Sequence, residues 1–191
     1  MLQKKGFTLA EVLITLGIIG VVATLTVPSL YANYQKKALS ARLKKVYNEI
    51  NAAAKLAVVK EKALNFYMTD AFYEQTFLKD YFKLTKDCGI GVAHYKECFG
   101  NSYTEHGEDI SLESSSSEGA INNSSHCVLT ADLFSICLDK EGYGILDING
   151  PSGPNKFDLD TFVIKISEKG TISTEYSQSL EDIKRNNWEI E

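Results

Sequence analysis

A single acidic residue, Glu11, stands near the start of an otherwise apolar stretch of the chain. The nineteen residues from Val12 to Leu30 carry no charge. An ionised carboxylate in a membrane helix costs about 2.5–3.5 kcal/mol on insertion scales, so it normally has a cationic partner. A cut between Gly6 and Phe7 would create an α-amino group four residues before Glu11. The sequence therefore predicts an amine–carboxylate pair, within one chain or between neighbouring chains.

Four cysteines form a second group of reactive side chains, and they fall into two pairs with nine residues between the members: Cys88 with Cys98, and Cys127 with Cys137. No Cys-x-x-Cys or Cys-x-x-His occurs, which argues against zinc. An even count behind an anchored N-terminus favours disulfides in an oxidising compartment. Of the three possible connectivities we favour these two local pairs, because the second would close a hairpin. Reduced, buried cysteines are the alternative.

A polar loop near the C-terminus gathers oxygen donors around glycine and proline residues. The candidate ligands are Asp147, Asn149, Asp158 and Asp160, and hard oxygen donors of this kind suit calcium. The loop is not an EF-hand, because it lacks the glutamate at the twelfth position and the flanking helices. The alternative is a turn rich in Asp and Asn that satisfies its own backbone.

Signals of catalysis are absent from the sequence, which contains no Gly-x-Ser-x-Gly, no phosphate-binding glycine loop and no His-Glu-x-x-His. The three histidines, His94, His106 and His126, all fall in the turn-rich middle of the chain. His126 directly precedes Cys127, and neighbouring residues of a strand point to opposite faces, so the two do not form a nucleophile pair. We therefore expect a protein that is not an enzyme.

The elements that carry these residues begin with one long helix, expected from about Thr8 to about Asn65. Residues 7–30 match the roughly 20 residues that a helix needs to cross a bilayer. Residues 31–66 show an amphipathic pattern and form the soluble half of the helix. A bend or loosening is expected near Gly17, Gly20 and Pro28.

The remainder, residues 67–191, is expected to be one small globular domain. Residues 70–86 carry apolar side chains at helical spacing and predict a second helix, with Thr69 or Asp70 as its N-cap. Residues 113–125 are polar and of low complexity, which predicts an exposed loop. The strands are expected at residues 127–131, 134–138, 144–148, 161–167 and 171–176. The predicted fold class is α+β, a long N-terminal helix packed against a small antiparallel sheet of three to five strands, with Trp188 as a packing anchor.

Charge is distributed unevenly along the chain, although the formal net charge is only −5. Residues 7–65 contain eight Lys or Arg against three Glu, whereas residues 66–191 contain ten against twenty-two acidic residues. The acidic domain argues against nucleic acid as a partner, because phosphate binding needs clustered cations. Lys4 and Lys5 precede the apolar run, so the N-terminus is expected on the cytoplasmic side with the rest of the chain outside.

The N-terminal stretch Lys4-Lys5-Gly6-Phe7-Thr8-Leu9-Ala10-Glu11, followed by an apolar helix, resembles the class III signal of type IV pilins and type II secretion pseudopilins. The resemblance covers residues 3–30, and Pro28 falls where many pilins have a proline that kinks the helix. It implies a leader of residues 1–6, cleavage after Gly6 by a prepilin peptidase and N-methylation of Phe7. It also implies that Glu11 docks each subunit onto a neighbour's N-terminus.

The C-terminal polar loop also resembles the Asp-x-Asn-Gly loop found near the end of many pseudopilins, where related loops can bind calcium. This chain has Phe157-Asp158 where a glycine is common. The resemblance implies a pseudopilin of a type II secretion system, held in the inner membrane and then assembled into a filament. Its expected partners are other pilin or pseudopilin subunits, the prepilin peptidase, an inner-membrane assembly platform and membrane lipid.

Two other functions remain compatible with the sequence. A type IV pilus or competence pilin, for adhesion or DNA uptake, would share the N-terminal motif. A membrane-tethered binding protein or hydrolase would use the helix only as an anchor. Mass spectrometry separates the classes, because a pilin begins at a methylated Phe7 whereas a tethered enzyme keeps Met1 or loses only that residue.

Overall fold

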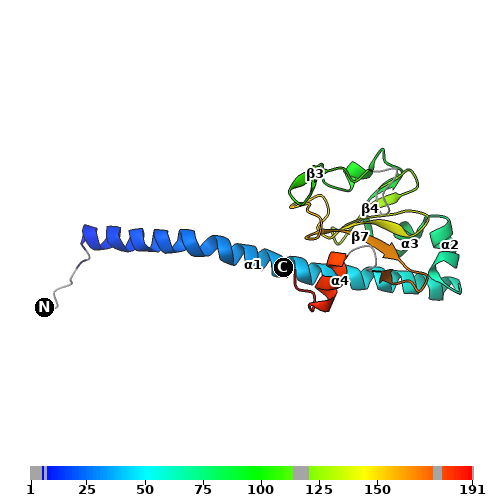
Figure 1. The fold of residues 1–191 in the computed structure, drawn as a ribbon, viewed down its shortest axis with the longest axis horizontal. Helices are drawn as coiled ribbons and strands as arrows, with labels where there is room; N and C mark the ends of the chain where they lie inside the picture. Colours follow the sequence, from blue (N-terminus) through cyan, green and yellow to red (C-terminus); the bar gives the residue numbers. More distant parts are fainter. Residues whose placement is uncertain (1–5, 7, 114–120, 174–177, 191) are drawn as a thin grey trace. The chain divides into compact units, whose positions relative to one another are not determined.

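A computed structural model describes residue 6 and residues 8–113, 121–173 and 178–190. The chain divides into two units, residues 1–38 and residues 39–191, which are described separately. The helix α1, Leu9–Glu61, contributes to both (Figure 1). Phe7, Lys4, Lys5 and most of the leader lie outside the described residues, as do parts of the expected loop at 113–125 and of the last expected strand.

The first unit consists of the N-terminal part of α1, whose large apolar side chains are exposed along its length. An 18-residue window of α1 has a mean hydropathy of 2.2, and none of that window is buried in the protein. By length and composition this helix can cross a membrane. The helix runs through Pro28 without interruption, and whether the proline bends it stays a prediction.

The second unit is organised around the C-terminal part of α1. Seven side chains of this part are buried, at helical spacing: Leu43, Val46, Tyr47, Ile50, Ala53, Ala54 and Ala57. They join a cluster that includes Ile136, Leu146, Phe162 and Ile164 from the sheet. The amphipathic pattern therefore positions one face of the helix against the sheet, as the sequence predicts.

The sheet has six strands, more than the three to five expected from the sequence. All neighbours are antiparallel, in the order β1-β4-β5-β6-β7-β8. The strands are β1 (Leu84–Ile90), β4 (His126–Thr130), β5 (Ser135–Leu138), β6 (Tyr143–Asp147), β7 (Thr161–Ile166) and β8 (Ile172–Ser173). A separate two-stranded sheet pairs β2 (Tyr103–Glu105) with β3 (Glu108–Ile110). The α+β class is confirmed.

The expected helix at residues 70–86 is wrong in part. The structure has α2 (Asp70–Tyr73) and α3 (Phe77–Tyr81), and residues from Leu84 onward belong to β1. Gln75 adopts a φ of 58°, a left-handed conformation that separates the two helices. Thr69 is the N-cap of α2, and its side chain accepts a hydrogen bond from the N–H of Phe72. The apolar spacing reflects burial of Phe77 and Leu78 rather than one continuous helix.

Three short elements complete the second unit: the 3₁₀ helices η1 (Phe66–Met68) and η2 (Tyr95–Glu97), and the helix α4 (Gln178–Arg185). Beyond α4, Trp188 contacts Tyr47 of α1 edge to face, with ring centroids 4.9 Å apart. A second apolar cluster surrounds the cysteines and includes Tyr95, Phe99 and Tyr103.

Candidate processing and assembly site

The start of α1 is held by three reciprocal hydrogen bonds between Thr8 and Glu11. The N–H and the hydroxyl of Thr8 each donate to Glu11 Oε2 at 2.8 Å, and the N–H of Glu11 donates to Thr8 Oγ1 at 3.3 Å. This arrangement is a capping box, in which two unpaired N–H groups of a helix start are satisfied by side chains. The Thr-x-x-Glu spacing of Thr8 and Glu11 is the sequence signal of a capping box, and it was missed among the predictions from sequence.

The structure describes only one of the two residues at the predicted cut. Gly6 is exposed and lies outside any helix, as a peptidase substrate requires, whereas Phe7 lies outside the described residues. Glu11 is on the first turn of α1, exposed, with Thr8 as its partner in the described chain. Cleavage after Gly6 and the docking of Glu11 onto an amine therefore stay predictions.

The hydroxyl groups inside the apolar part of α1 are satisfied within the helix. Thr15, Thr24, Thr26 and Ser29 each donate to a backbone carbonyl three or four residues earlier. In hydrocarbon no water is present to satisfy a hydroxyl, so a polar side chain must find its partner in the protein. These residues are therefore compatible with a lipid-facing helix.

The cysteines form two disulfides, Cys88–Cys98 and Cys127–Cys137, which is the local pairing favoured by the sequence. Cys127 and Cys137 are direct partners in the register of β4 and β5, so their bond closes a hairpin. The pairing of β1 with β4 shifts register between Asp87 and Gly89, which leaves Cys88 as an extra residue. All four cysteines are buried in the second apolar cluster.

The four candidate calcium ligands do not share one environment. Asp147 and Asp160 are fully buried, Asn149 is nearly so, and Asp158 is exposed. Asp147 accepts hydrogen bonds from the hydroxyl of Tyr103 at 2.7 Å and from the N–H of Asn149 at 3.1 Å. The carboxylate of Asp160 accepts two further backbone N–H groups, those of residues 155 and 156, at 2.8 and 2.6 Å.

This network already satisfies the carboxylates that a calcium ion would need. The Oδ1 atom of Asn149 is buried and has no hydrogen-bond partner among the described residues, so this oxygen could serve as a metal ligand. However, no three Asp, Glu, His or Cys residues in the described chain are grouped closely enough to hold a metal. The geometry favours a structural turn at this loop, and calcium binding stays a prediction.

Burial has a large electrostatic effect on Asp147. It raises the pKa of this carboxyl group to about 7, against the hydrogen bond from Tyr103, and the negative charge of Asp160 adds to the rise. Burial also raises the pKa of Asp160. Tyr103 was missed by the sequence analysis, because no local pattern signals a contact between residues 44 positions apart.

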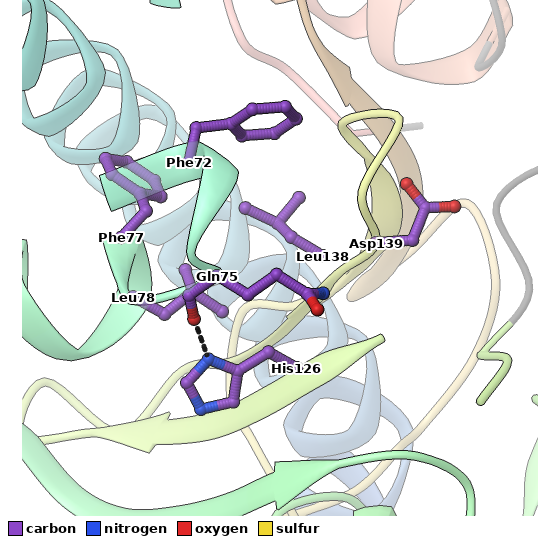
Figure 2. Close-up of a pocket in the computed structure, with 7 residues that line it drawn as sticks. All are labelled: Phe72, Gln75, Phe77, Leu78, His126, Leu138 and Asp139. Atoms are coloured by element: carbon purple, nitrogen blue, oxygen red, sulfur yellow. Dashed lines mark hydrogen bonds between the residues drawn. The ribbon is translucent and has the colours of Figure 1, made fainter. Parts of the chain in front are cut away.

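The histidines are dispersed rather than clustered. His94 lies beside Glu97, and His106 occupies a turn with a φ of 51°. His126 is buried, and its Nδ1 contacts the carbonyl oxygen of Gln75 at 2.8 Å (Figure 2). Its Nε2 contacts Asp87 Oδ1, also at 2.8 Å. Burial opposes ionisation of Asp87, but hydrogen bonds from His126 and from the N–H of Gly89 outweigh it and hold the pKa of Asp87 below its usual value. These bonds tie β4 to β1 and to the α2–α3 connection.

Comparison with known proteins identifies the N-terminal segment. Residues 1–27 match the family model of the prokaryotic N-terminal methylation motif, the prepilin signal of type IV pilins and pseudopilins. No curated protein and no solved structure matches the chain. The motif supports a type IV pilin-like protein that is processed by a prepilin peptidase and assembles with other pilin subunits, and it points to a structural role. The signal and the apolar helix are consistent with membrane anchoring.

Proposed function

We propose that this pilin-like protein is a pseudopilin of a type II secretion system, which polymerises into a filament that drives protein export. The observation that carries the proposal is a carboxylate, Glu11, placed one turn into an exposed apolar helix that follows a methylation motif. Such a helix is stable in lipid before assembly and among other apolar helices afterwards. The choice of a secretion filament rests on the Asp-x-Asn-Gly loop between β6 and β7.

The proposed topology places the N-terminus in the cytoplasm and the second unit outside the inner membrane. Lys4 and Lys5 support this orientation through the excess of positive charge on the cytoplasmic side. The two disulfides support it as well, because disulfides persist in oxidising compartments.

The proposed role of Glu11 is to pair with the methylated amine of Phe7, on its own chain or on a neighbour's. Two of the hydrogen bonds that Thr8 donates occupy only one oxygen of Glu11, Oε2. Among the described hydrogen bonds, Oε1 of Glu11 receives none, so one oxygen is open to a cation.

The first experiment is mass spectrometry of the protein purified from cells with an active prepilin peptidase. A chain that begins at a methylated Phe7 supports processing, whereas an intact leader overturns it.

The second experiment is Glu11→Val, which keeps the size of the side chain similar and removes the charge. Membrane insertion should persist or improve, because the variant removes a cost of about 2.5–3.5 kcal/mol. Filament assembly should be lost.

A matched control for Glu11→Val is Glu49→Gln, which alters a carboxylate of the same helix in the second unit. It should leave processing, insertion and assembly intact. Deleting the gene then distinguishes the uses of the filament: loss of protein export supports the pseudopilin, whereas loss of DNA uptake or of adhesion with normal export assigns a type IV pilin role.

A further inference from the structure

A groove of about 510 Å³ opens on the second unit, away from the residues discussed so far. Its lining combines three aromatic side chains with one base and one acid: Tyr67, Phe72, Tyr73, Lys140 and Glu141. The aromatic wall comes from η1 and α2, and the charged wall from the turn between β5 and β6. The volume lies within the range of about 300–1,000 Å³ that is usual for small-molecule sites.

The aromatic wall is held rigidly. The hydroxyl of Tyr67 donates to the carbonyl oxygen of Ile166 at 2.6 Å, and its ring lies against the α-carbon of Gly142, where a Cβ atom would come within 3.1 Å of it. Phe72 lies 4.9 Å from Tyr67, centroid to centroid, with the ring planes at 31°. Phe72 also contacts Phe66, with ring centroids 5.0 Å apart. Two neighbouring ring faces are therefore fixed before any ligand arrives.

The charged wall is fixed by a short turn. Asp139 Oδ1 accepts the N–H groups of Glu141 and Tyr143, both at 2.9 Å, which holds the backbone of this turn. In Figure 2 Phe72 and Asp139 lie on opposite sides of a smaller neighbouring pocket, with Leu138 between them. The two walls of the groove thus border the same smaller pocket.

The groups at the mouth of the groove are exposed and available. Tyr73 is 84% exposed, although it is a large aromatic residue that directly follows the half-buried Phe72. Lys140 and Glu141 are exposed, and neither makes an ion pair within the described ranges. The groove is therefore bordered by a hydrogen-bond donor, Lys140, by an acceptor, Glu141, and by the exposed ring of Tyr73.

We propose that this groove binds a neutral saccharide of one or two sugar rings. An aromatic face carries partial negative charge and attracts the weakly positive C–H face of a sugar ring. Lys140 donates and Glu141 accepts hydrogen bonds, which matches hydroxyl groups that do both. The charges of Lys140 and Glu141 offset each other, so an ion of either sign would meet one like charge as well as one opposite charge in the groove. A neutral ligand with an apolar face and hydroxylated edges uses all five residues without such a conflict.

The experiment is titration of the isotope-labelled full-length protein by NMR, in a polyoxyethylene detergent that has neither a sugar nor an ammonium head group. The probes are glucose, galactose, N-acetylglucosamine, lactose and cellobiose, with choline and glutamate as charged competitors. At least one sugar should give saturable shifts at the amides of Tyr73, Lys140 and Glu141, with a dissociation constant of about 1 mM. Tyr73→Ala should weaken that binding about fivefold, because the loss of one ring contact is worth about 1 kcal/mol.

Two sets of variants make the result specific. Tyr34→Ala removes a tyrosine of similar exposure, 71%, that does not line the groove, and it should leave sugar binding unchanged. The double variant Lys140→Gln, Glu141→Gln removes both charges but keeps hydrogen-bonding side chains, and it should weaken binding less than Tyr73→Ala does. The proposal is overturned if no sugar gives saturable shifts, if choline or glutamate binds more tightly than every sugar, or if Tyr34→Ala and Tyr73→Ala act equally.

Discussion

The two parts of helix α1 share one backbone geometry but differ in what surrounds them. Before residue 39 its large apolar side chains are exposed, among them Ile18 at 60% and Leu25 at 74%. After residue 39 seven side chains are buried, and Leu43 and Ile50 are fully inaccessible. Residues 12–30 are apolar on all sides, whereas the part after residue 39 is apolar on one face. A helix that is apolar all round suits lipid or contact with other helices, and a helix with one apolar face suits packing on its own core.

This difference in burial indicates that the stability of the second unit does not depend on the apolar residues of the first. Burial of apolar side chains stabilises a fold, and the side chains before residue 39 contribute little of it within one chain. Substitutions before residue 39 are therefore expected to spare the folding of the second unit, whereas substitutions on the buried face after residue 39 are expected to weaken it.

The difference between the two parts of α1 is tested most strongly by comparing the variants Ile50→Ala and Ile18→Ala. Ile50→Ala should lower the free energy of unfolding of the second unit by about 2–5 kcal/mol, because it leaves a cavity in a packed core. Ile18→Ala should change it by less than about 0.5 kcal/mol. The measurement is denaturant unfolding followed by the fluorescence of Trp188, the single tryptophan, which contacts Tyr47. Similar losses in the two variants would contradict the division.

The two units also differ in the environment of their carboxyl groups, since Glu11 in the first unit is exposed and Asp147 in the second is fully buried. The pKa of Asp147 is about 7 in the folded protein and about 3.9 in an unfolded chain. The folded state therefore holds the proton more tightly, and between about pH 4 and pH 7 the free energy of unfolding falls as pH rises, by up to about 1.4 kcal/mol per unit from this group.

Asp147→Asn should remove that part of the slope, which unfolding curves collected across this pH range would measure. Asp160, whose pKa burial also raises, leaves a residual slope of the same sign. Asp109→Asn replaces an exposed acid of β3 and is the matched control, with no expected change in slope. An unaltered slope in Asp147→Asn would show that the carboxyl group is already ionised when folded.

The smallest expected effect concerns the capping box at the start of α1. Thr8→Ala should destabilise the first turn of the helix by about 1 kcal/mol, because it removes the hydroxyl that caps the N–H of Glu11 and binds its carboxylate. Faster amide hydrogen exchange at residues 9–12 in micelles would measure the loss. Thr24→Ala removes a hydroxyl that donates to a carbonyl within the helix, and exchange at residues 9–12 should not change.

Local patterns predicted most of the fold. The 3.6-residue spacing predicted which face of α1 is buried, and alternation and turn residues predicted β4 to β7 to within one or two residues. The strand β1 was missed because Leu84 and its neighbours follow an aromatic run with helical spacing, and Gln75, whose left-handed φ separates the helices, carries no signal of that conformation.

The candidate site residues also differ in how well the sequence predicts them. Glu11 and Gly6 were identified from a short contiguous motif. The hydrogen bond from Tyr103 to Asp147 and the groove lined by Tyr67 and Lys140 join residues from distant parts of the chain. Such contacts depend on tertiary packing, which neither composition nor periodicity encodes in one sequence.

The irregular pairing of β1 affects how readily the second unit can aggregate through its sheet. This strand is at the end of the sheet order, where an open row of backbone groups can recruit a strand from another molecule. Two register shifts within seven residues interrupt that row, and the N–H of Gly89 donates to the side chain of Asp87 at 2.9 Å. An interrupted edge of this kind is a poor template for a strand of another molecule, which lowers the risk of sheet-to-sheet aggregation at β1.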